Sequence, residues 1–167
     1  GYNLTKVDIQ SEKNLRIDTS DNATAGEDLT LSAQIVGQGG ITFAADSDQT
    51  IIIGNATNEY YGATTVQSGQ LALGASHGLG NTSALVVNDG AGFLLNSFTQ
   101  TVGSISGNGA IDLGSGTLTV TNGGEQNLSI TNAIKGNEGT LSFDLNGGVL
   151  TVGNTNSSQW AGRVELT

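Results

Sequence analysis

Strand-like runs of three to five residues recur along this chain, and a turn rich in Gly or Asn follows most of them. Residues 58–74 show the pattern clearly: an aromatic pair, a glycine turn, Thr-Thr-Val, a second glycine turn and Leu-Ala-Leu. Alternation of apolar and polar residues predicts strands with one buried face. No run is long enough to bury a core by itself. Each short strand must therefore pack against a neighbouring copy of the same pattern.

The pattern returns after about 100 residues, where residues 159–166 place Trp160 at the position of Tyr60 and Gly162 at that of Gly62. Other apolar and glycine positions match at an offset of 99: Leu29, Leu31, Ile35, Gly37 and Gly40 with Leu128, Ile130, Ile134, Gly136 and Gly139. We therefore interpret residues 1–167 as a single segment with an internal superperiod of about a hundred residues. Its best-matching unit covers 58–120, and the pattern restarts near 159.

Short strands that stack on their equivalents one coil later predict an all-β fold, a right-handed parallel β-helix. At about twenty residues per coil, the segment would hold about eight rungs spaced by roughly 4.8 Å. Stacked polar side chains that hydrogen-bond along the stack would explain the abundance of Thr, Asn and Ser. An up-and-down sandwich or barrel is the alternative, and the shortness of the strands disfavours it.

The charge distribution excludes several classes of partner. The net charge is −10, and no Lys or Arg lies between Arg16 and Lys135. Nucleic acids and anionic membrane surfaces both need clustered cations, so neither is an expected partner. No apolar run is long enough for a membrane-spanning helix, so we expect the segment not to be embedded in a membrane. Because the chain contains no Met, we read it as a piece of a longer protein.

Residues 58–74, 90–95 and 102–113 resemble the autotransporter-associated β-strand repeat, which occurs in passenger domains of bacterial type V secreted proteins. The resemblance implies a β-helical passenger displayed outside the bacterial cell and anchored through an outer-membrane barrel that lies beyond this chain. Many such passengers are adhesins, or self-associate to aggregate cells and build biofilm. The absence of Cys suits a protein that crosses an oxidising compartment unfolded.

Catalytic and metal-binding patterns are weak. Asp46 and Asp48 form a carboxylate pair of the kind used by glycoside hydrolases or calcium-assisted lyases, but a solvated loop is the simpler interpretation. His77, the only histidine, lies in a turn-like context that suits an exposed residue better than a Ser-His-Asp triad. We expect no enzymatic activity, no cofactor and no metal site. The glycine clusters at 37–40 and 136–139 are expected to be turns with positive φ and not phosphate loops.

Tyr60, Tyr61 and Trp160 either form a binding patch for a sugar or a protein, or cover the edge of the core at a corner. Together with Asp46, Asp48 and Glu59 they make up the candidate interaction surface. The favoured function is a non-enzymatic cell-surface adhesin segment that associates with itself or with a protein or glycan on a host or neighbouring cell. A rigid stalk that presents another domain is the alternative. A β-helical polysaccharide lyase or hydrolase comes third.

Overall fold

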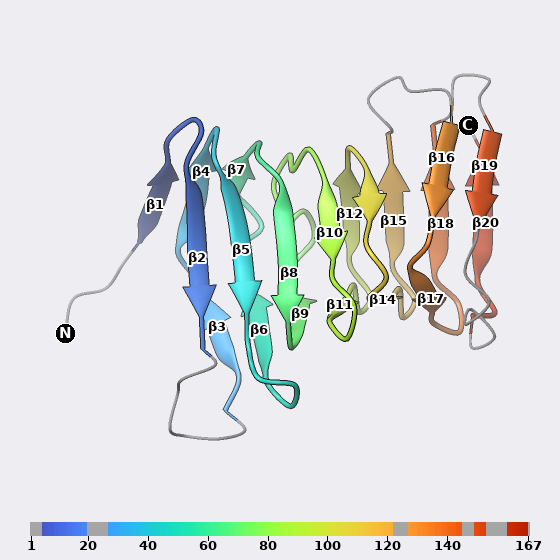
Figure 1. Cartoon of the computed structure of the whole chain (residues 1–167), viewed down its shortest axis with the longest axis horizontal. Helices are drawn as coiled ribbons and strands as arrows, with labels where there is room; N and C mark the ends of the chain where they lie inside the picture. The colour runs from blue at the N-terminus through green and yellow to red at the C-terminus, as the bar shows by residue number, and fades with distance from the viewer. Residues whose placement is uncertain (1–4, 20–26, 122–126, 145–148, 153–159, 167) are drawn as a thin grey trace.

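The computed structural model describes residues 5–19, 27–121, 127–144, 149–152 and 160–166. Short β-strands follow one another throughout, stacked along the long axis of the molecule (Figure 1). The strands are β1 (Lys6–Ile9), β2 (Asn14–Asp18), β3 (Leu29–Leu31), β4 (Gln34–Gly37), β5 (Gly40–Ala44), β6 (Thr50–Ile53), β7 (Glu59–Tyr60), β8 (Thr64–Ser68), β9 (Gln70–Leu73), β10 (Leu85–Val87), β11 (Gly92–Leu94), β12 (Thr99–Val102), β13 (Ile105–Ser106), β14 (Ala110–Asp112), β15 (Thr117–Val120), β16 (Asn127–Ile130), β17 (Ala133–Lys135), β18 (Thr140–Phe143), β19 (Val149–Val152) and β20 (Arg163–Leu166). No helix in these ranges is long and apolar enough to cross a membrane.

The strands form three faces around a common core. Face I contains β1-β4-β7 and, further along, β12-β15-β18-β20. Face II contains β2-β5-β8-β10-β13, and face III contains β3-β6-β9-β11-β14-β17. Strands β16 and β19 pair in a separate two-stranded sheet. Chain order visits the faces in turn, so the backbone coils and each strand lies beside its equivalent from another turn.

The predicted all-β parallel solenoid is confirmed. Every strand pairing that the structure describes is parallel, which excludes the up-and-down sandwich or barrel. On face III Gln70 pairs with Gly92, Gly92 with Ala110 and Ala110 with Ala133, so a turn there takes 18 to 23 residues. The described chain makes about five turns, fewer than the eight expected. A complete turn needs a strand on each face, whereas the sequence estimate divided the whole length by twenty.

Apolar side chains from successive turns stack into columns inside the solenoid. One column consists of register partners that are at most 1% exposed: Ile51, Leu71, Phe93, Ile111 and Ile134. Full burial of one such side chain contributes about 1.5–3 kcal/mol. Since each residue contacts its counterparts in adjacent turns, the core is continuous along the axis and no turn can be buried without its neighbours.

Two buried amide side chains join the parts of face I across residues 77–82, where the chain forms a turn and not a strand. Asn58 accepts a hydrogen bond from the Ile35 amide (2.7 Å) and donates one to the Gly78 carbonyl (2.7 Å). Gln100 accepts from the Leu79 amide (2.9 Å) and donates to the Gly80 carbonyl (3.2 Å). These side chains satisfy backbone groups that a strand ladder would otherwise pair, as buried polar groups require.

The glycine turns expected near residues 37 and 136 are present, with φ values of +114° at Gly37 and +119° at Gly136. Gly37 pairs with Tyr60, and Gly136 pairs with Trp160. The first pair lies on face I, while Gly136 directly follows β17 of face III. The same local turn thus serves two different corners. Residue 159, where the sequence pattern restarts, lies outside the described residues, and the hundred-residue superperiod stays a prediction.

Candidate functional site

Asp46 and Asp48 lie in the exposed loop that connects β5 of face II to β6 of face III. The Asp46 carbonyl accepts a hydrogen bond from the Gln49 amide (3.0 Å), which closes the loop as a turn. Among the described residues, no three His, Cys, Asp or Glu side chains gather closely enough to hold a metal ion. The pair therefore sits on a solvated turn, as its simpler interpretation had it.

Tyr60 requires a correction, because its side chain is fully buried and cannot form part of an interaction surface. Its hydroxyl lies 2.7 Å from Thr64 Oγ1, which in turn lies 2.9 Å from Thr82 Oγ1. Burial raises the pKa of the Tyr60 phenol above its usual range, and the hydrogen bond to Thr64 offsets part of that rise. Adjacent Tyr61 is 49% exposed, and Glu59 is also exposed.

Trp160 is half-buried and packs against the hydrophobic core at a corner, in line with its alternative reading as a cover for the core edge. The six candidate residues do not converge. Asp46 and Asp48 lie where faces II and III meet, and Glu59 and Tyr61 belong to face I or follow it directly. Trp160 pairs with Gly136 several turns away. They do not form a single site.

His77 is exposed, as expected for a turn residue, and has a positive φ of 58°. Its amide donates to the Thr99 carbonyl (2.8 Å), and its carbonyl accepts from the Gly80 amide (2.9 Å). The backbone of His77 therefore has a structural part in the turn between the two halves of face I.

A regular array of hydroxyl groups lies on the outer side of face I. We define this hydroxyl face by the outward residues of β12, β15 and β18: Thr99, Thr101, Thr117, Thr119, Thr140 and Ser142. The members stand in register, because Thr99 pairs with Thr117 and Thr117 with Thr140. The intervening residues, such as Gln100 and Leu118, point inward and are buried. Three consecutive turns thus present hydroxyl side chains in two columns, and no charged side chain interrupts them.

The sequence contained a signal for this face that was not used to locate it. Thr-x-Thr occurs at 99–101 and 117–119, and Thr-x-Ser at 140–142. The spacing between these triplets is 18 and then 23 residues. A search at one fixed period does not align them. The strand pairing does. At the C-terminal edge of the face, Arg163 and Glu165 form an exposed ion pair (2.6 Å).

Sequence comparison finds similarity to long envelope and secreted proteins. Over 125 residues the chain is 36% identical to the adhesin BmaC autotransporter of Brucella suis biovar 1 (strain 1330), an alignment that covers 72% of the chain and 4% of that protein. It is 31% identical over 158 residues to the lipoprotein YdeK of Escherichia coli (strain K12), covering 93% of the chain and 11% of that protein. It is 28% identical over 126 residues to the Escherichia coli protein YuaQ, covering 74% of the chain and 9% of that protein.

The chain therefore spans 11% or less of the length of these three relatives. It matches no protein-family model and no solved structure. The similarity to part of an autotransporter adhesin agrees with the resemblance found in residues 58–120. The particular type of repeat stays a prediction.

Proposed function

We propose that this chain is a non-enzymatic segment of a bacterial cell-surface adhesin, and that copies on neighbouring cells associate through the hydroxyl face. The observation that carries the proposal is the uncharged, in-register array of Thr99, Thr101, Thr117, Thr119, Thr140 and Ser142 on a parallel solenoid. The similarity to an autotransporter adhesin and to a lipoprotein supports display on the cell envelope.

The physics of the face suits weak, repeated contacts. Strand pairing holds the hydroxyl groups about 4.8 Å apart along each column. Threonine is β-branched, so its side chain loses little rotamer freedom when it is covered. Polar cross-strand contacts of this kind are worth roughly 0.2–1 kcal/mol each. A single pair of faces would bind weakly, and dense display of many copies would multiply the effect.

A rigid stalk is the second candidate, favoured by the same continuous stack of turns. About five turns at roughly 4.8 Å per turn give a stiff spacer that could hold another domain away from the membrane. The stalk and the adhesin differ in one respect: a stalk has no use for the hydroxyl face. A lyase or hydrolase function would instead depend on Asp46 and Asp48, which lie on a solvated turn.

The test measures settling of cells that display the full-length protein. In the variant Thr99→Val, Thr101→Val, Thr117→Val and Thr119→Val, the shape of the face is kept while four hydroxyl groups are lost. We expect settling to slow several-fold. The matched control, Thr42→Val with Thr65→Val, changes register partners on the outer side of face II and should leave settling unchanged. Unchanged settling of the face I variant, at equal surface level, would favour the stalk. A second comparison, Asp46→Lys with Asp48→Lys, separates the hydroxyl face from the acidic corner.

A further inference from the structure

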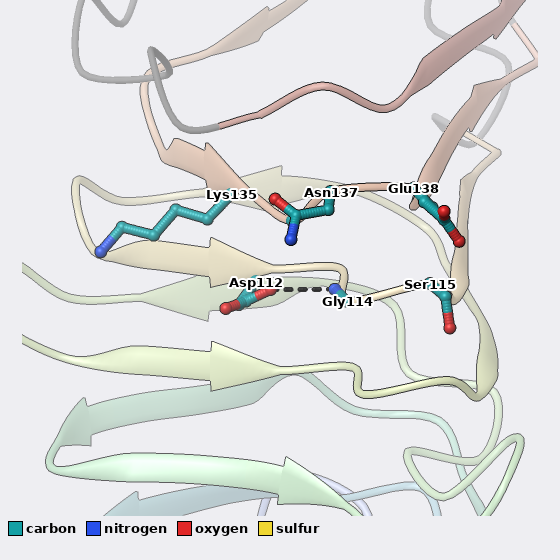
Figure 2. Close-up of a pocket in the computed structure, with 7 residues that line it drawn as sticks. Asp112, Gly114, Ser115, Lys135, Asn137 and Glu138 are labelled. Carbon is teal, nitrogen blue, oxygen red and sulfur yellow. Dashed lines mark hydrogen bonds between the residues drawn. The ribbon is translucent and has the colours of Figure 1, made fainter.

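A polar depression of about 780 Å³ lies at the corner where face III leads back to face I. Its side chains come from two neighbouring turns (Figure 2). Asp112 and Ser115 belong to the segment that begins with β14, and Lys135, Asn137 and Glu138 to the one that begins with β17. This depression lies on a different part of the surface from the hydroxyl face.

The base of the depression is bare backbone. Gly114 and Gly136 line it, and both have positive φ. A β-carbon at Gly136 would come 2.9 Å from the Gly114 amide nitrogen, so a larger residue at this position would fill the floor. The Gly114 amide donates a hydrogen bond to Asp112 Oδ1 (2.9 Å), which fixes the carboxylate beside the floor (Figure 2).

The groups around this floor form a mixed set of donors and acceptors. Asp112 and Lys135 are cross-strand partners in register, and Lys135 makes no ion pair in the described part of the chain. Figure 2 shows the Asn137 amide between the Lys135 side chain and the Glu138 carboxylate. Carboxylates accept only, an ammonium donates only, and an amide does both. Such a set can bind neighbouring hydroxyl groups that must each donate and accept.

The lining also restricts the kind of ligand. Pockets for drug-like molecules are lined mostly by apolar and aromatic side chains, whereas the side chains that line this depression are all polar or charged. Two carboxylates against one ammonium, on a chain of net charge −10, disfavour an anionic ligand. The ammonium of Lys135 disfavours a bare divalent cation. A neutral, polyhydroxylated molecule remains.

A low apolar strip extends from the depression along the solenoid axis. The outward register partners that precede Asp112 on face III are Leu94, Ala72 and Ile52. Leu94 and Ile52 are partly exposed, and Ala72 is 5% exposed. The strip offers apolar contact for the C–H faces of sugar rings beyond the polar depression.

We propose that this corner is a binding site for a neutral glycan, with one sugar unit in the depression and the adjoining units on the strip of Leu94, Ala72 and Ile52. The site goes beyond the proposed self-association, because it uses different residues and a different class of ligand. Substitutions here should leave the settling of cells unchanged, and those on the hydroxyl face should leave glycan binding unchanged. The two proposals can therefore fail separately.

The test is a titration of the ¹⁵N-labelled chain with neutral oligosaccharides, namely maltohexaose, cellotetraose, laminarihexaose and chitotetraose, followed by amide chemical shifts. We expect saturable shifts at Gly114, Ser115, Gly136 and Asn137 with at least one of them. Lys135→Met and Asn137→Ala should each weaken that binding about three- to tenfold, the loss expected for one hydrogen bond. Lys13→Met and Asn108→Ala, at distant exposed positions, are the matched controls.

Unchanged amide shifts in the core strands show that each variant is folded. Oligogalacturonate, an acidic probe, should not bind. The proposal is overturned if none of the four neutral oligosaccharides shifts these amides at millimolar concentration. Shifts that persist undiminished in both Lys135→Met and Asn137→Ala would overturn it as well.

Discussion

At residue 60 the chain buries a tyrosine completely, and two threonine hydroxyl groups from neighbouring turns complete its hydrogen bonding. A buried phenol without a partner would cost about 1–3 kcal/mol. With Thr64 and Thr82 in place, the hydroxyl groups form a short chain that links face I to the start of β8. The polar interior of this fold is satisfied locally, turn by turn.

Tyr60→Phe should therefore destabilise the chain by about 1 kcal/mol at neutral pH, because one hydrogen bond is lost while Thr64 keeps its contact with Thr82. Burial holds the folded pKa of Tyr60 above the unfolded value, which is about 10. The stabilising difference is complete below the unfolded pKa. It is lost as the pH rises from there toward the folded pKa.

Urea unfolding of the wild type and of Tyr60→Phe between pH 7 and pH 11 measures this effect. The wild type should lose up to about 1.4 kcal/mol per pH unit above pH 10 from this group. The variant lacks that loss, so its deficit at neutral pH should shrink or reverse. Parallel pH profiles for the two proteins would contradict the account.

The side of the sheet taken by each tyrosine was not predictable from the sequence. Tyr60 and Tyr61 are adjacent, and alternation allows only one of them to point inward. The register of β7 against β4 decides the choice, since Gly37 leaves space opposite Tyr60. The sequence pattern identified the aromatic corner, and the long-range pairing determined which residue is buried there.

Among the elements, the turn that joins β7 to β8 depends on a glycine contact. A β-carbon at Gly62 would overlap the backbone of Gly39 and Gly40 in the preceding turn. Gly62→Ala should therefore force two turns apart and destabilise the chain by about 1–3 kcal/mol, the usual cost of overpacking. Its φ carries no strain of its own.

The matched control is Gly92→Ala in β11, where the nearest atom to the added methyl group would be the Gln70 side chain at 3.7 Å. Thermal unfolding of both variants gives the comparison. We expect a clear fall in Tm for Gly62→Ala and a small change for Gly92→Ala. Equal shifts would mean that close approach of the turns at Gly62 is not the limiting contact.

The strands and turns were largely predictable, whereas their partners were not. Alternating runs such as 117–120 and 140–143 became strands as expected. Their pairing could not be read from a fixed period, because the length of a turn varies from 18 to 23 residues on faces I and III. Residues 77–82 fill a position on face I without forming a strand, and Asn58 and Gln100 make the necessary hydrogen bonds there. For the same reason the hydroxyl face became visible only through pairing.

On the scale of the whole molecule, each turn is stabilised chiefly by its two neighbours. Solenoids of this kind behave as a row of units with nearest-neighbour interactions. Strands in the middle of the row, such as β8 and β9, pair on both sides and bury their inward side chains fully. Strand β20 pairs with β18 alone in the described structure, and its Val164 and Leu166 are 43% and 64% exposed.

Hydrogen exchange of the 167-residue chain should therefore show a gradient along the axis. Amides of β8, β9, β10 and β11 should exchange at least about tenfold more slowly than those of β1 and β20, because local opening at an end breaks one interface and opening in the middle breaks two. Exchange measured by mass spectrometry on peptides from each strand provides the comparison, with Phe93→Ala as the internal check. That variant removes a fully buried ring from β11, so it should raise exchange most in β9 and β14, the two strands that pair with β11. A uniform rise over every strand would instead show that the turns unfold together as one cooperative unit.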